Sequence, residues 1–178
     1  MLVYALWSYI TFQTLDKGWV GSIAYLPHGC RVLFYCFFGF RSLPALYLAE
    51  ITGPTLVWGD QYLAYWGFAS ICSLFSVVIA VEILKWSSVS TFTYSLLKEI
   101  NFANYKFLIF VIIISALINS IFTNLILGFL NDVVISAKVV ARFFIGDVLG
   151  SFIFITWLMI MFNMIKDRNL YPVHDDRK

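Results

Sequence analysis

The sequence has few charged residues for its length. Charged side chains make up 12% of its 178 residues, whereas a soluble domain carries about a quarter. Hydrophobic residues make up 61% of the chain, and the basic residues are scattered at the ends of apolar runs without forming a patch. Nucleic acid is therefore not an expected partner. This composition predicts an integral membrane protein.

The sequence also has few cysteines and no recognisable catalytic motif. Cys30, Cys36 and Cys72 lie inside apolar runs without the spacing of metal ligands, which predicts small buried side chains. GxSxG, HExxH and P-loop patterns are absent. We therefore predict a protein that is not an enzyme and has no metal or cofactor. Contact with lipid, a quinone or a pigment stays open, because the many aromatic side chains suit a lipid-facing belt or such a surface.

Six apolar runs are candidates for membrane-spanning helices, because about 20 apolar residues cross a hydrocarbon core of about 30 Å. The last three runs are long enough to span alone, and the first is short. In chain order the runs are 2–15, 20–40, 43–58, 63–84, 107–130 and 139–165. The sequence therefore predicts an all-α transmembrane bundle of about six spans, built as a single domain of residues 1–165.

The second and third runs are predicted to form a tight helical hairpin. Only Arg41 and Ser42 separate them, and Pro44 suits the first turn of the following helix. Proline is tolerated near a helix start and not in its middle, so the continuous helix of the second run is expected to begin near Pro27.

Basic residues predict the orientation of the bundle, because Lys and Arg concentrate in short cytoplasmic loops. With both termini inside, eight basic residues lie on the cytoplasmic side and two lie outside. This bias supports an even number of spans and this orientation. Residues 166–178 are predicted to be a short charged cytoplasmic tail. Residues 87–101 are predicted to form an amphipathic helix on the cytoplasmic face, with a polar loop as the alternative.

Several polar residues fall inside the predicted spans. Arg31, Glu50, Asn119 and Asp147 share one central slab when depth is counted at about 1.5 Å per residue. A charge at this depth is costly, so such side chains face inward and pair. We predict that Arg31 is the central donor, with Asp147 and Glu50 as its candidate acceptors. Arg142 lies nearer the outer surface, where it either snorkels to the interface or joins this network.

Other polar residues extend this predicted cluster. Ser115, Asn119 and Thr123 are spaced by four and form a stripe on one helix face, which is expected to point into the bundle. His28 lies at the mouth of the second run. A hydrogen-bonded interface residue is favoured there over a titrating or metal-binding role, because no partner lies at ligand spacing.

The predicted cluster supports two interpretations. It is either a ligand pocket, proton path or signalling switch, which intramembrane charges often mark, or a structural network that fixes the helix register. The residues alone do not separate these interpretations.

Two stretches carry a recognisable pattern. LPHGCRVLFYCFFGFRSLPALYLAEI contains P-x-G followed by G-x-R-x-x-P, and RFFIGDVLGSFIFI contains G-D-x-x-G near the start of a late span. In this order they resemble the MASE1 family of bacterial membrane sensor domains, over most of the chain. The residues of the pattern are Pro27, Gly29, Gly39, Arg41 and Pro44, then Gly146, Asp147 and Gly150. Three of these glycines, Gly29, Gly146 and Gly150, also predict close helix packing, because small residues let helices approach.

The resemblance implies a membrane module that senses a ligand or contacts another membrane protein. Members of the family usually have more spans than the six runs counted here, and they are fused to a histidine kinase or a cyclic-dinucleotide enzyme. Because the predicted tail of this chain is short, no such output domain is expected. A signal is therefore expected to pass through another polypeptide.

Three functions stay open on the sequence. The first is a MASE1-like protein that interacts with another integral membrane protein and senses a ligand through the polar cluster. The second is an accessory structural subunit of a larger respiratory or photosynthetic membrane complex. The third is a small-solute transporter or substrate-capture component, which requires a cavity reaching one face and broken helices. Lipids and other integral membrane proteins are the expected partners.

Overall fold

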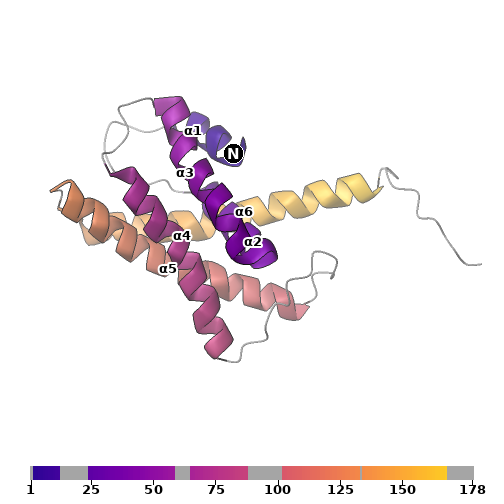
Figure 1. Cartoon of the computed structure of the whole chain (residues 1–178). Helices are drawn as coiled ribbons and strands as arrows, with labels where there is room; N and C mark the ends of the chain where they lie inside the picture. Colours follow the sequence, from indigo (N-terminus) through magenta and orange to yellow (C-terminus); the bar gives the residue numbers. More distant parts are fainter. Residues whose placement is uncertain (1, 13–23, 59–64, 88–101, 133, 168–178) are drawn as a thin grey trace, which may run out of the picture.

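The structure is a computed structural model that describes residues 2–12, 24–58, 65–87, 102–132 and 134–167. Within these ranges the regular structure is helical and contains no strand, as predicted (Figure 1). The elements are α1 (Leu2–Phe12), α2 (Leu26–Phe38), the 3₁₀ helix η1 (Gly39–Ser42), α3 (Leu43–Trp58), α4 (Trp66–Trp86), α5 (Phe102–Leu130) and α6 (Ala137–Asp167).

Four helical stretches of the described residues are long and apolar enough to cross a membrane. Trp66–Trp86, Lys106–Leu130 and Ala137–Phe162 correspond to the three long runs of the sequence, with ends shifted by a few residues. The fourth stretch, Leu26–Gly53, contains parts of both runs of the predicted hairpin. Length and apolarity thus support four candidate spans. The count of six spans and the cytoplasmic position of both termini stay predictions.

The chain reverses direction within the stretch Leu26–Gly53, as the hairpin prediction requires. Arg31 and Glu50 are 19 residues apart, which is about 28 Å along a straight helix. Their side chains are nevertheless hydrogen-bonded at 2.8 Å, so α2 and α3 must fold back around η1. Gly39 ends α2 with a φ of 59°, a conformation that glycine adopts without a steric penalty. Pro27 lies in the first turn of α2, as predicted.

The first apolar run is only partly described. α1 has 11 residues, about 16 Å of helix, and it is not among the four candidate spans. It packs against α3, where a Cβ atom added to Gly53 would lie 2.7 Å from the Cβ of Tyr4. This close approach buries Tyr4 and aims its hydroxyl at the interior of the bundle.

The apolar core lies between α2, α4 and α5. α4 and α5 pack against each other, and α2 completes the core. Cys30 and Cys36 are buried as predicted, whereas Cys72 is partly exposed, and none of the three forms a disulfide. The core cluster comprises Val32, Tyr35, Cys36, Val77, Val78, Ala80, Val81, Leu84, Phe107, Leu108, Val111 and Ile112.

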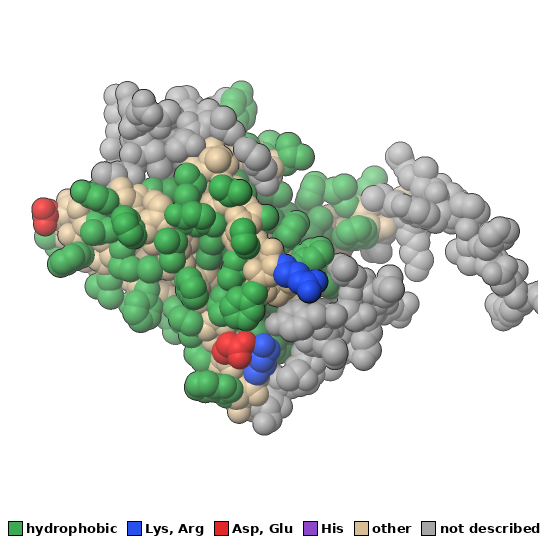
Figure 2. All heavy atoms as spheres, viewed as in Figure 1, with side chains coloured by type: hydrophobic (Ala, Val, Ile, Leu, Met, Phe, Trp, Pro, Cys, Tyr) green, Lys and Arg blue, Asp and Glu red, His purple; other side chains and the backbone are tan. Residues whose placement is uncertain are grey.

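The outward-facing side chains are mostly hydrophobic. Figure 2 shows a surface in which hydrophobic side chains outnumber charged ones over the described helices. α5 illustrates the pattern, because Leu117, Phe122 and Leu125 are at least half exposed while Ser115 and Asn119 are buried. A soluble monomer rarely exposes so much contiguous apolar surface. The polar side of α5 faces inward, as its predicted stripe requires.

α6 is long and divides into two parts. Its 31 residues extend about 46 Å, more than a hydrocarbon core of about 30 Å. The first part packs against α2 and α5, and the second part extends beyond the other labelled helices (Figure 1, yellow). We call residues 156–164 the projecting segment. Its exposed side chains are Thr156, Trp157, Met159, Ile160, Met161, Phe162 and Met164.

Two predicted elements fall outside the described part of the chain. The predicted amphipathic helix at 87–101 falls almost entirely on residues 88–101, and most of the predicted tail falls on residues 168–178. Both stay predictions.

Candidate functional site

The centre of the bundle contains a buried ion pair between α2 and α3. Arg31 Nη2 donates to Glu50 Oε1 at 2.8 Å, and both side chains are 1% exposed. Ser73 of α4 donates to the same Oε1 at 3.1 Å, and Arg31 Nε donates to the Tyr4 hydroxyl at 3.5 Å. The Tyr25 ring adds a cation–π contact, with its centroid 5.7 Å from Arg31 Cζ. The prediction that Arg31 pairs with Glu50 is confirmed.

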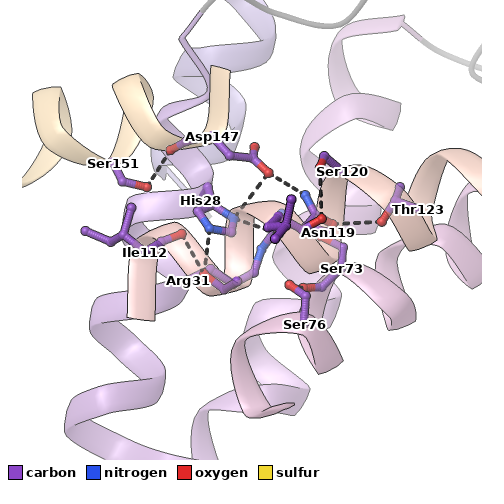
Figure 3. A network of polar contacts seen from close by, with 12 residues as sticks. His28, Arg31, Ser73, Ser76, Ile112, Asn119, Ser120, Thr123, Asp147 and Ser151 are labelled. Atoms are coloured by element: carbon purple, nitrogen blue, oxygen red, sulfur yellow. Dashed lines mark hydrogen bonds and ion pairs between the residues drawn. The ribbon is translucent and has the colours of Figure 1, made fainter. Parts of the chain in front are cut away.

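The carboxylate of Asp147 belongs to a second part of the network, on α6. Asn119 Nδ2 donates to Asp147 Oδ2 at 2.6 Å, and Thr123 donates to Asn119 Oδ1 at 2.7 Å, which orients the amide. Of the two candidate acceptors for Arg31, only Glu50 is bonded to it: no hydrogen bond or ion pair joins Asp147 to the guanidinium, and His28 Nδ1 lies next to both groups (Figure 3).

His28 connects the two parts. It lies one turn before Arg31 on the same face of α2, so the imidazole and the guanidinium are neighbours. Arg31 Nη1 lies 3.4 Å from His28 Nδ1, and the same Nδ1 lies 3.7 Å from Asp147 Oδ2. On its other side, His28 Nε2 lies 3.0 Å from Ser115 Oγ of α5. His28 is thus a hydrogen-bonded interface residue, as the sequence favoured (Figure 3).

The glycines of the two resembling stretches bring α2 and α6 together beside this network. The backbone N–H of Tyr25 donates to Gly146 O at 2.7 Å. A Cβ atom at Gly150 would overlap the Tyr25 backbone, and a Cβ atom at Gly29 would lie 2.8 Å from Ser151 Cα. Gly29 and Gly150 therefore permit the close packing that the sequence predicted, whereas Gly146 contributes through its carbonyl oxygen.

Arg142 is not part of the network. It is half-buried on α6, its Nε is buried without a hydrogen-bond partner, and it forms no ion pair with the described cluster residues. Two alternatives were predicted for Arg142, and the structure contradicts the one in which it joins the network.

Sequence reasoning missed two hydroxyl groups that complete the ion pair, those of Tyr4 and Ser73. Ser73 belongs to a series of serines spaced by three on α4, Ser70, Ser73 and Ser76, and all three are buried. Such a series inside an apolar run was a usable signal. Tyr4 had none, because an aromatic residue in an apolar run is usually read as a lipid contact.

Two buried oxygen atoms in this region have no hydrogen-bond partner. These are the second carboxylate oxygen of Glu50, Oε2, and the hydroxyl oxygen of Ser70, which lies one turn before Ser73. An ordered water molecule typically satisfies such groups in a buried polar site.

The chemistry available to the network is proton exchange and charge pairing. Among the described residues, no group of three His, Cys, Asp or Glu side chains is arranged to hold a metal ion. The polar side chains of the network are bonded to other side chains of this chain. The arrangement can therefore respond to the addition or removal of a charge at its centre.

Together, the fold and the network define the class of protein. In the residues that the structure describes, it is an α-helical protein with four stretches long and apolar enough to span a membrane, and its buried polar network joins residues of the six described α-helices. Comparison of the chain with protein-family models, curated proteins and solved structures finds no match.

Proposed function

We propose that this chain is a non-enzymatic, MASE1-like protein of a bacterial inner membrane that acts by contacting another integral membrane protein. The buried network serves as its sensing element. The resemblance rests on the two stretches in α2–α3 and α6, and these stretches contact each other where Gly29 meets Ser151, while Gly150 packs against the backbone of Tyr25, just before the first stretch. This contact supports treating the two stretches as one unit.

The projecting segment is the observation that carries the interaction. Trp157, Ile160 and Phe162 are all more than half exposed, and they point in different directions around the helix. In a bundle that is complete by itself, neighbouring helices cover part of the circumference of each span. Among the described residues, no neighbouring helix covers the projecting segment in this way. Three methionines in the segment suit it to an adaptable protein contact, because methionine side chains are flexible and polarisable.

The network and the projecting segment lie on one rigid element. Asp147 is ten residues before Trp157, about 15 Å along α6. A change of charge at Asp147 that alters the packing of α6 on α2 would also shift the projecting segment. This connection gives a sensing element a physical route to a partner.

Site-specific photo-crosslinking in native membranes tests the interaction. A photoreactive amino acid at position 157 or 162 is expected to trap one discrete membrane protein. The same amino acid at Phe122 or Leu125 of α5, which are similarly exposed to the surroundings, serves as the matched control and is expected to trap lipid. Equal trapping of proteins at both helices, or trapping of lipid alone at α6, would contradict the proposal.

A permanent structural subunit of a larger membrane assembly is the second candidate. The direct pairing of Arg31 with Glu50 and of Asn119 with Asp147 favours it, because groups that satisfy one another fix helix register without a ligand. The two candidates differ in the lifetime of the complex. A structural subunit stays with its partner through detergent purification at high dilution, whereas a sensing module dissociates.

A further inference from the structure

A second arginine, Arg142 on α6, has no partner among the described residues. Its Nε is buried without a hydrogen-bond partner, and no ion pair of the described chain includes it. Arg142 lies five residues after the start of α6, about 7.5 Å along the axis, within the apolar stretch Ala137–Phe162. Arginine keeps its charge in proteins, and a charge inside such a stretch is costly. The guanidinium therefore needs water or a negatively charged ligand.

α2 and α6 begin at the same end of the bundle. Tyr25, just before α2, donates its N–H to Gly146 O at 2.7 Å, and Gly29, in the first turn of α2, packs on Ser151. The contacts advance together along both helices, so the two helices run in the same direction. The N-terminal end of a helix carries about half a positive charge. Both ends therefore add positive potential to the region around Arg142.

Aromatic side chains mark the level of the membrane interface at this end. The Tyr25 ring lies edge-on to the ring of Trp7 on α1, with centroids 6.2 Å apart, and both side chains are partly exposed. Tyrosine and tryptophan concentrate where a bilayer meets water. Tyr25 bonds to Gly146, and Arg142 lies one helical turn closer to the start of α6, about 6 Å. Arg142 is therefore at the level of the lipid headgroups.

A second basic side chain lies on the same side of α6. Lys138 is exposed and comes four residues before Arg142, so the two side chains are neighbours on the helix surface. Asp132, in the connection between α5 and α6, is exposed and forms no ion pair with either of them among the described residues. Asp147 is buried and bonded to Asn119. Positive charge therefore predominates at the start of α6.

An exposed apolar stripe continues from these basic residues along α6. Ile145, Leu149 and Ile153 follow Arg142 by three, seven and eleven residues, so all three lie on its side of the helix. Their exposed fractions are 50%, 43% and 50%. A phospholipid has the same arrangement, because its phosphate lies above its acyl chains. Free phosphate has no part that would contact the stripe.

We propose that Arg142 and Lys138 bind the phosphate group of an anionic phospholipid, whose acyl chains lie along the stripe of Ile145, Leu149 and Ile153. The planar guanidinium donates two parallel N–H bonds to the phosphate oxygens, and the lysine ammonium supplies a second positive charge. The site lies at the opposite end of α6 from the projecting segment, and it does not depend on the proposed function.

Native mass spectrometry of the full chain in detergent micelles, titrated with phosphatidylglycerol, measures the affinity for the first bound lipid. We expect Arg142→Gln to weaken this affinity about tenfold, because it removes a pair of charge-assisted hydrogen bonds. Lys138→Gln should weaken it about fivefold, the usual effect of one basic residue near an anionic membrane surface. Because Lys138 is exposed, this second variant keeps the test valid if Arg142→Gln lowers the helical content measured by circular dichroism.

Arg41→Gln is the matched control, because it removes the same charge from an exposed arginine at the other end of α2. This end is about 20 Å from the start of α2, roughly two screening lengths in ordinary buffer, so the affinity should not change. Equal weakening by Arg41→Gln and Arg142→Gln, or no weakening by Arg142→Gln and Lys138→Gln, would overturn the proposal.

Two further ligands separate the possible sources of the phosphate. Phosphatidylcholine has the same phosphate and acyl chains without net negative charge, and we expect it to bind more weakly than phosphatidylglycerol. Inorganic phosphate at the same concentration should not displace the bound lipid. Equal binding of the two lipids would overturn the preference for an anionic lipid, and displacement by inorganic phosphate would assign the site to a free anion. None of these measurements involves the partner trapped at positions 157 and 162, so the two proposals can fail independently.

Discussion

Residues 137–155 and 156–164 of α6 are both rich in apolar side chains, yet their surroundings are opposite. The first part carries Asp147, Gly150 and Ser151, and all three are buried against α2 and α5. The second part, the projecting segment, has no buried side chain among those the structure describes: Leu158 is partly exposed and the others are exposed. Apolar surface does not drive helices together in lipid, because lipid tails are equally apolar. The packed part of α6 is therefore distinguished by its buried polar side chains and by the close approach at Gly150, and not by its hydropathy.

The largest effect is expected when the ion pair is broken. Arg31→Met leaves Glu50 buried without its countercharge, which should lower the free energy of unfolding by about 3–5 kcal/mol. Arg142→Met is the matched control on α6, where we expect less than about 1 kcal/mol, because Arg142 has no ion pair with the cluster. Unfolding in mixed detergent micelles measures both. Equal losses would mean that burial of arginine, and not its pairing, decides stability.

A smaller but clear effect is expected at the contact between α2 and α6. Gly150→Ala places a methyl group on the Tyr25 backbone, so the two helices must separate, at a cost of about 1–3 kcal/mol. Gly67→Ala is the control, because its methyl group would meet only the Tyr47 hydroxyl at an ordinary 3.4 Å. The same unfolding assay compares them. A Gly150→Ala variant as stable as the Gly67→Ala variant would show that this close approach is not present in the membrane.

The hydrogen bond that orients Asn119 should contribute less. Thr123→Val removes the donor to Asn119 Oδ1 and should cost about 1 kcal/mol. Thr52→Val serves for comparison, because the Thr52 hydroxyl bonds to Leu48 O within its own helix, near the surface. In the nuclear magnetic resonance spectrum of the chain labelled with carboxyl-¹³C-aspartate, Thr123→Val should also move the signal of Asp147, which is identified by its loss in Asp147→Asn. A spectrum identical to that of the parent protein would contradict the assigned amide orientation.

The smallest effect on stability is expected in the projecting segment. Trp157→Leu and Phe162→Leu should change the free energy of unfolding by less than about 0.5 kcal/mol, because neither side chain is enclosed by the bundle. Both should nevertheless weaken recovery of the partner in the crosslinking assay. A loss of stability comparable to that of Gly150→Ala would place this segment inside the folded unit and remove the contrast between the two parts of α6.

Much of the fold could be predicted from local signals. Gly39, Arg41 and Pro44 mark the turn between α2 and α3, because glycine permits the positive φ and proline suits the start of the next helix. The buried stripe on α5 followed from a spacing of four residues. The number of spans did not follow, because hydropathy counts apolar runs and does not show whether Leu26–Gly53 crosses the membrane once, twice or not fully.

The pairing within the candidate site could be predicted only in part. Depth along the predicted spans brought Arg31, Glu50, Asn119 and Asp147 to one level, and the structure joins them in one network. Depth does not give the rotation of each helix about its axis. That rotation decides that Glu50 meets Arg31 directly and that Asp147 meets Asn119 instead. It also decides the contribution of Tyr4, which no spacing in the sequence indicated.

A double-mutant cycle on the ion pair tests the central claim most directly. Arg31→Met and Glu50→Leu are made singly and together, and the free energy of unfolding is measured for all four proteins in the same micelles. Because Arg31 and Glu50 bond directly, the loss of stability in the double variant should be smaller than the sum of the two single losses, by a coupling energy of about 1.5–3 kcal/mol. Single effects that add without coupling would show that Arg31 and Glu50 do not meet, and the account of the network would be wrong.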